Sequence, residues 1–130
     1  MPKTQPRRKD LIYPDLCYTI GGVLFDVGNE LSFGHREHFY QKAVAERLKG
    51  IGLKFDEQLP AKVYFQGKYI GIYYFDFLID NKIILEIKVA EDFYQKDVNQ
   101  LLSYLKHNQY RLGILAIFTK KGLKFKRILN

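Results

Sequence analysis

The spacing of hydrophobic residues along the chain predicts two helices in its first part. Residues 15–31 place apolar side chains at helical intervals, and Asp15 is the expected N-cap. Gly21 and Gly22 lower the helix propensity of this segment, so we expect them to allow close approach of another element. A second helical pattern spans about residues 35–49 and ends at the glycines of "KGIG". The chain is therefore expected to begin with a helical pair.

The middle of the chain changes to a strand pattern. Residues 53–90 are rich in Val, Ile, Tyr and Phe, and turn-forming residues interrupt them at 66–68 and 80–82. This pattern predicts three or four antiparallel strands that follow one another as a meander.

A third helix and two more strands are predicted after the meander. The helix spans about residues 92–108, where Asp92 and Gln95 resemble a capping box. Residues 111–119 form a continuous apolar run typical of a buried strand, and residues 123–129 alternate apolar and basic side chains like an edge strand. The predicted order is α-α-β-β-β-β-α-β-β when four strands are counted in the meander, which is a mixed α/β fold.

Length and composition fit one folded domain with a basic surface. The 130 residues, 47% of them hydrophobic, suit a single domain over residues 11–130 after a flexible basic arm at 1–10. The formal net charge is +7, with basic residues clustered at both ends. This charge indicates either a nucleic-acid partner or merely an excess of solvated lysines. A domain of this size would also gain from a covering partner, so a homodimer is one expected assembly.

The sequence argues against disulfides, cysteine-ligated metals, a membrane span and a secretory signal. The single cysteine, Cys17, rules out an internal disulfide and a cysteine-ligated metal site within one chain, and we expect it to be a small core residue. No apolar run approaches the roughly 20 residues that span a bilayer. The basic N-terminus lacks the apolar core of a secretory signal, so the expected location is cytoplasmic.

Three charged residues stand out in the stretch "FDFLIDNKIILEIKV", residues 75–89. They are Asp76, Glu86 and Lys88, in a segment that is otherwise apolar except at the turn residues 80–82. A two-residue turn would send Asp76 and Glu86 to opposite faces of the hairpin, whereas a three-residue turn at 80–82 pairs them on one face. The second register leaves the other face wholly apolar, and the hydrophobic pattern therefore favours it. That apolar face would consist of Phe75, Phe77, Ile79, Ile83, Leu85, Ile87 and Val89.

Two paired carboxylates repel each other, and two interpretations remain open from the hairpin alone. The face could be a partly exposed surface with an ordinary Glu–Lys pair, or its charge could be balanced by a divalent metal. Polar residues on both flanking helices bear on this choice. Glu37 lies at the edge of the apolar stripe of the second helix, and Gln100 and Tyr104 share one edge of the third at i, i+4 spacing.

These residues, in this order, resemble the PD-(D/E)XK nuclease superfamily. The resemblance rests on Asp76 followed by Glu86-Ile87-Lys88, on an upstream helical glutamate and on the later Q-x-x-x-Y of Gln100 and Tyr104. The closer likeness is to its GxxExxY group, whose motif reads Gly34-His35-Arg36-Glu37-His38-Phe39-Tyr40 here. The resemblance covers about residues 12–130. Phe75 stands where the superfamily's name has proline, and no arginine precedes Asp76 in "YYFD".

The resemblance implies a restriction-endonuclease-like core, a mixed sheet with a central antiparallel β-meander flanked by helices. It also implies a nuclease that hydrolyses phosphodiester bonds in DNA with Mg²⁺ or Mn²⁺. Lys88 would hold the attacking water, and Gln100 and Tyr104 would orient water or a phosphate. The implied metal ligands are Glu37, directly or through water, Asp76, Glu86 and the backbone carbonyl of Ile87.

One alternative to this enzyme and one alternative set of site residues remain. The chain could be a catalytically silent nuclease-fold protein that binds nucleic acid or a protein partner, and the basic ends suit that role equally. His35, His38 and His107 could serve a metal or acid–base role, although surface positions are expected for all three.

Overall fold

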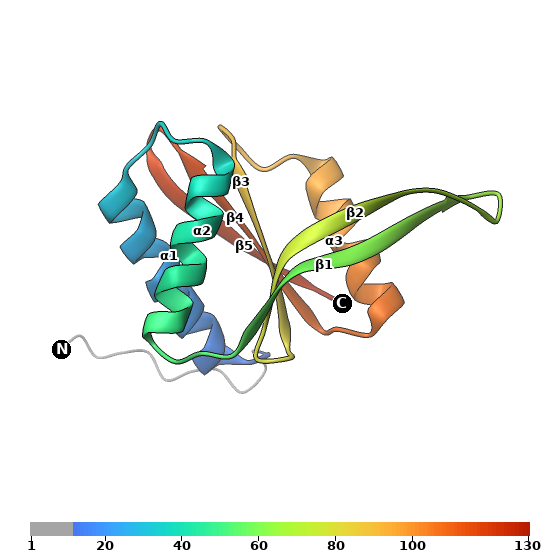
Figure 1. The fold of residues 1–130 in the computed structure, drawn as a ribbon, viewed down its shortest axis with the longest axis horizontal. Helices are drawn as coiled ribbons and strands as arrows, with labels where there is room; N and C mark the ends of the chain where they lie inside the picture. The colour runs from blue at the N-terminus through green and yellow to red at the C-terminus, as the bar shows by residue number, and fades with distance from the viewer. Residues whose placement is uncertain (1–11) are drawn as a thin grey trace.

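The computed structural model describes residues 12–130, and the basic arm predicted at 1–10 lies outside them. In the described residues, three helices and five strands follow one another in the predicted order, with three strands in the meander (Figure 1). The helices are α1 (Pro14–Leu31), α2 (Glu37–Gly50) and α3 (Gln95–Asn108). The strands are β1 (Phe55–Phe65), β2 (Lys68–Ile79), β3 (Ile83–Val89), β4 (Leu112–Thr119) and β5 (Gly122–Leu129).

The strands form one mixed sheet in the order β1-β2-β3-β4-β5. Strands β1 to β3 are antiparallel neighbours, β3 and β4 are parallel, and β4 and β5 are antiparallel again. Parallel neighbours need a long crossover connection, which α3 provides between β3 and β4. The mixed sheet flanked by helices confirms the predicted α/β fold class.

Helices cover both faces of this sheet. One apolar cluster joins α1 and α2 to one face, and a second cluster joins α3 to the other. Strand β4 is buried along its whole length because it lies between β3 and β5 with helices on both sides. Its Gly113 lets α3 come close, since a Cβ there would lie only 3.0 Å from side-chain atoms of Leu101. No helix in residues 12–130 is long and apolar enough to cross a membrane.

The predicted helix starts need correction. The N-cap of α1 is Tyr13, with φ 51°, and Asp15 instead falls in the first helical turn. The N-cap of α3 is Tyr94, without a side-chain cap, so the predicted capping box of Asp92 and Gln95 is wrong. Asp92 Oδ1 instead accepts a hydrogen bond from the backbone N–H of its neighbour Phe93 at 2.8 Å. In both places the backbone, and no side-chain cap, sets where the helix begins.

Of the two glycines in α1 that were expected to allow close packing, only Gly21 does so. A Cβ on Gly21 would lie 3.4 Å from the ring of Phe125 in β5, so this glycine does allow a close approach. Gly22 faces open space, with nothing within 4 Å of such a Cβ. The close packing of α1 on the sheet therefore requires only the first of the two.

The register predicted for the β2–β3 hairpin is confirmed. Ile79 pairs with Ile83 and Phe77 with Leu85, which is the register of the three-residue turn at 80–82. Asn81 has the expected left-handed conformation, with φ 56°. This register sets Asp76 across from Glu86.

One residue of the predicted apolar face is misplaced. Phe75 packs in the α3-side cluster and not with Phe77 on the α1–α2 side. The alternation of β2 fails at Asp76, where the opposing residue of β1, Gln58, has φ 56° and lacks a ladder partner. This irregularity turns the preceding part of β2 toward α3.

Candidate active site

Asp76 and Glu86 lie where the backbone ladder between β2 and β3 stops. The N–H of Asp76 donates to Oε1 of Glu86 at 3.0 Å, and the N–H of Ile87 donates to Oδ2 of Asp76 at 2.7 Å. Each carboxylate therefore takes the place of a backbone carbonyl on the opposite strand. Asp76 is only 5% exposed and Glu86 only 4%, so both side chains are almost completely shielded from solvent.

Lys88 lies on the same face of β3 as Glu86, as predicted. Its Nζ is 3.7 Å from Oε2 of Glu86 and donates to the hydroxyl of Tyr73 at 3.0 Å. The Tyr73 hydroxyl in turn donates to Oε2 of Glu86. Tyr73 thus fixes the acid and the amine relative to each other, and the sequence analysis missed it because a tyrosine is ordinary in a strand.

The α2 helix adds two more side chains to this group. Oε1 of Glu37 accepts from the backbone N–H of Val89 at 3.2 Å. The amide nitrogen of Gln41 donates to Oδ1 of Asp76 at 2.8 Å and lies 3.4 Å from Oε2 of Glu37. Gln41 was also missed, although its i, i+4 spacing from Glu37 places both on one side of the helix.

The segment from Gly34 to Tyr40 sets the position of Glu37. Gly34 has φ 121°, a conformation that favours glycine, in the turn before α2. The Tyr40 hydroxyl donates to the carbonyl of Ser32, and its buried ring stacks on Phe118 with centroids 4.3 Å apart. Tyr40 therefore anchors the start of α2 to the core, which leaves Glu37 in the first turn facing β3.

The buried acids are strongly perturbed. Burial, together with the charge of Glu86, raises the pKa of Asp76 to about 8. Burial also raises the pKa of Glu86, although the hydrogen bond from Tyr73 and the charge of Lys88 act in the opposite direction. Like charges so close together resist simultaneous ionisation, so in the absence of a bound metal ion the pair holds one proton near neutral pH.

The neighbours of Glu86 are perturbed as well. Burial, and then the hydrogen bond to Glu86, raises the pKa of Tyr73 to about 12, so its hydroxyl stays protonated. Burial alone would lower the pKa of Lys88, but the hydrogen bond to Tyr73 and the charge of Glu86 hold it above its usual range. The amine is therefore a permanent cation beside the acids.

The donor chemistry of this group fits a hard divalent cation. Three carboxylates, those of Glu37, Asp76 and Glu86, face the single ammonium of Lys88 among the side chains that these contacts join. Mg²⁺ is usually bound by one or two carboxylates and completes its shell with waters and substrate phosphates. Within residues 12–130, no three His, Cys, Asp or Glu side chains are arranged as a metal-binding group. The fit therefore rests on two acids, Asp76 and Glu86, because the carboxylate of Glu37 already accepts hydrogen bonds from Val89 and Gln41.

The remaining predicted residues lie apart from these contacts. Gln100 is exposed on α3, and no hydrogen bond of its side chain is found within the described part of the chain. Tyr104 packs against Phe75, with ring centroids 4.6 Å apart, in the α3-side cluster. Burial and the neighbouring Tyr110 raise the pKa of Tyr104. The three histidines, His35, His38 and His107, are exposed, as expected.

Comparisons with known proteins bear on the family and the fold of this chain. A family model described as the PD-(D/E)XK nuclease superfamily matches residues 14–128. Comparison with curated proteins gives no match. Among solved structures, "Crystal structure of SSO0001" superposes with a TM-score of 0.57 at 20% identity over 72% of this chain. This chain spans 50% of the length of that protein, and the likeness concerns the fold.

Proposed function

This chain belongs to the PD-(D/E)XK nuclease superfamily, and from that membership we propose that it is a metal-dependent nuclease that hydrolyses phosphodiester bonds in DNA. The observation that carries the proposal is the pair of buried acids, Asp76 and Glu86, joined through Tyr73 to the amine of Lys88. Burying two neighbouring acids is costly, because one of them must hold a proton near neutral pH, and a structural role alone does not explain that cost. We further propose that the chain is of the GxxExxY group, with Glu37 as the glutamate of that motif.

The proposed ligands of Mg²⁺ or Mn²⁺ are the carboxylates of Asp76 and Glu86 and the backbone carbonyl of Ile87. Glu37 would act through a water, because its two oxygens are engaged by the N–H of Val89 and the amide of Gln41. When bound, the ion supplies relief of negative charge at the phosphate and a more acidic water.

The other side chains have roles in holding water and substrate. Lys88 would hold the attacking water through its ammonium and offset the charge that develops on the phosphate. Tyr73 would keep Lys88 and Glu86 in position. Gln100 and Tyr104, on α3, would orient a water or a phosphate oxygen, a role that rests on the motif and that their substitution by alanine would test.

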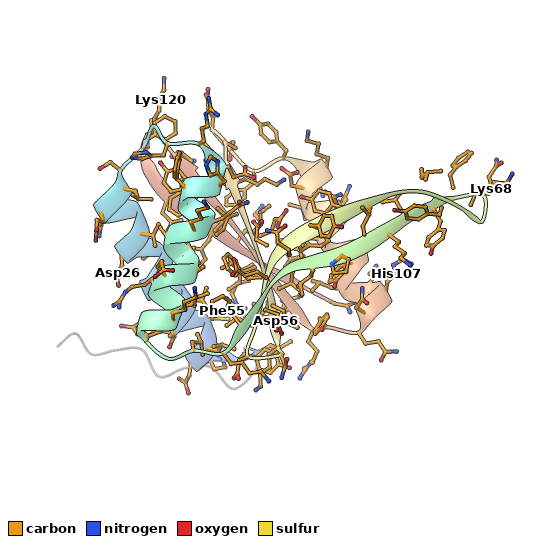
Figure 2. The ribbon with its side chains drawn as sticks, in the orientation of Figure 1. Asp26, Phe55, Asp56, Lys68, His107 and Lys120 are labelled. Carbon is orange, nitrogen blue, oxygen red and sulfur yellow. The ribbon has the colours of Figure 1, made fainter. Side chains whose placement is uncertain are left out.

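Cleavage assays on purified protein test the proposal. Wild-type protein should cut DNA with Mg²⁺ or Mn²⁺ and lose this activity in EDTA. Asp76→Ala and Lys88→Ala, purified identically, should cut nothing while retaining the circular dichroism of the wild type. Asp56→Ala, at an exposed acid near the base of β1 (Figure 2), should cut normally.

Absence of cleavage by the wild type on every DNA and RNA substrate would refute the nuclease assignment. The alternative, a catalytically silent nuclease-fold protein that binds nucleic acid or a protein partner, would then stand. Binding to nucleic acid through phosphates should weaken steeply as salt increases. A cytoplasmic location and a homodimer remain predictions, which cell fractionation and sedimentation would check.

A further inference from the structure

The β1–β2 pair extends beyond the body of the protein as a two-stranded arm, defined here as residues 60–74. Figure 1 shows the arm reaching past α3, and Figure 2 marks Lys68 at its far end. Its turn is Gln66-Gly67, where both residues have positive φ, and Phe65 pairs with Lys68 across it. Among the described elements, only β2 makes extensive contact with β1. The far part of the arm is therefore not covered by the rest of the described chain.

The arm exposes an unusual amount of apolar surface. Tyr64 and Tyr69, opposite one another near the tip, are 58% and 55% exposed, with ring centroids 6.0 Å apart and planes at 69°. A two-stranded hairpin is marginally stable in water, and large exposed apolar patches mark binding surfaces. The exposed large apolar side chains are Val63, Tyr64, Phe65, Tyr69, Ile70, Ile72 and Tyr74.

The charge of the arm indicates a polyanionic ligand. Residues 58–75 include Lys62 and Lys68 and contain no aspartate or glutamate. Exposed aromatic rings between lysines are typical of surfaces that bind single-stranded nucleic acid, where bases stack on rings and phosphates meet cations. The composition of the arm therefore matches an unpaired nucleic-acid strand.

Pairing with a second copy of the chain fits this arm less well. Strand β1 is an edge strand, and edge strands can recruit a further strand through their free backbone groups. Here Pro60 lacks an N–H, Gln58 has φ 56°, and the register shifts between Val63 and Tyr64. Each of these features interrupts the regular row of donors and acceptors that strand addition needs.

The arm leads directly into the candidate active site. Strand β2 continues without a break from Lys68 at the tip to Asp76 and beyond. Tyr69 and Asp76 are seven residues apart in β2, which corresponds to about 23 Å of strand. At the base of the arm, Tyr73 contacts both Glu86 and Lys88. A strand bound along the arm would therefore pass from the tip tyrosines toward the acids.

We propose that the arm binds single-stranded DNA by stacking unpaired bases on Tyr64 and Tyr69. If the chain is the nuclease proposed above, on which this second step rests, its preferred substrate carries an unpaired segment next to the phosphate that is cut. The binding step itself does not depend on cleavage.

Fluorescence anisotropy in EDTA tests the binding step separately from catalysis. The probes are a labelled oligodeoxythymidylate, which stays unpaired, and a labelled duplex of the same length. The variants are Tyr64→Leu/Tyr69→Leu, which keeps apolar bulk but removes the flat rings, and Tyr18→Leu on α1 as the matched control. We expect the wild type and the control to bind the single strand more tightly than the duplex. The double variant should lose about tenfold or more on the single strand, with little change on the duplex.

Four outcomes would overturn the proposal. They are equal loss on both probes, full retention of single-strand binding with leucine, tighter binding of the matching RNA, and a change of oligomeric state on sedimentation of the double variant. The last would identify the arm as a protein interface. If the binding results are as expected but the wild type cuts no substrate, the arm stands and only the nuclease proposal fails. If the wild type cuts DNA but single-strand binding does not depend on Tyr64 and Tyr69, the nuclease proposal stands and the arm proposal fails.

Discussion

Replacing Asp76 by asparagine should stabilise the metal-free protein and abolish the proposed metal binding. The carboxyl of Asp76 is almost fully buried, and its pKa is about 8 against an ordinary value of 3.8. Asparagine has nearly the same shape, and its carbonyl can still accept the hydrogen bond from the N–H of Ile87. The amide of Gln41, which donates to Oδ1 of Asp76, can rotate to present its oxygen to the asparagine nitrogen. The substitution therefore removes the cost of the acid while leaving the backbone contact in place.

The size of the effect follows from the shift in pKa. At pH 7 the carboxyl of Asp76 is protonated in the folded protein, whereas in the unfolded chain it ionises near pH 4. Each pH unit between these values lowers the free energy of unfolding by about 1.4 kcal/mol, which gives an upper bound of about 4 kcal/mol at pH 7. Because Asp76 and Glu86 share this perturbation, we expect roughly half, about 2 kcal/mol, which raises Tm by roughly 6 °C or more in a domain of this size.

The effect has a definite direction with pH. Below about pH 4, aspartate is protonated in both the folded and unfolded chain, so the cost disappears. As pH rises from about 4 to about 8, the unfolded chain loses its proton first, and wild-type stability falls relative to Asp76→Asn. Above about pH 8 the difference between the two proteins is complete.

Thermal unfolding followed by circular dichroism in EDTA measures this difference. Asp56→Asn, at an exposed acid in β1, is the matched control and should change Tm little at any pH. Adding Mg²⁺ should raise the Tm of the wild type but not of Asp76→Asn, and calorimetry should detect binding only to the former. Our reasoning is wrong if Asp76→Asn unfolds at or below the wild-type temperature near pH 8, or if the difference does not vary with pH.

Four further variants have defined expectations. Tyr73→Phe removes the hydroxyl shared by the acid and the amine, so calorimetry should show Mg²⁺ affinity lower by about tenfold to a hundredfold in a folded protein. Gly113→Ala would press a Cβ onto a buried leucine of α3, and urea unfolding should show a loss of about 1–3 kcal/mol. Lys62→Ala/Lys68→Ala should reduce the salt slope of single-strand binding by about 1.4, or about 0.7 for each cation. Gln58→Gly relieves a φ of 56°, and the same unfolding assay should show a gain of up to about 1 kcal/mol.

The sequence predicted the order of elements along the chain and the hairpin register because the apolar pattern constrains both. In the β2–β3 hairpin, a slip of one residue would mix charged and apolar side chains on both faces, so only one register was acceptable. The helix starts were less predictable. Tyr13 and Tyr94 hold N-cap positions without side-chain caps, so no residue-type signal marks them.

The site was predictable where residues broke the pattern and not where they fitted it. Asp76, Glu86 and Lys88 are charges in an apolar run, so their positions alone drew attention to them. Tyr73 is a tyrosine in a strand and Gln41 a glutamine on a half-buried helix side, and both are common there. Their roles depend on which hydroxyl or amide reaches a distant carboxylate, and only the folded chain reveals such contacts.

Phe75 lies on the face opposite to the predicted one because β2 is irregular at Asp76, where the candidate site also forms. Alternation along a strand holds while backbone groups pair regularly, and at Asp76 side chains replace the backbone partners. The strand therefore turns, so that Phe75 and Tyr73 lie against α3 while Asp76 meets Gln41 of α2. Phe75 packs on Tyr73 with ring centroids 4.9 Å apart, which holds the tyrosine hydroxyl near Glu86. The break in alternation between Asp76 and Phe77 thus turns Tyr73 and Phe75 toward α3 and Asp76 toward α2, whereas a strand alternating regularly from Phe77 would have placed them the other way round.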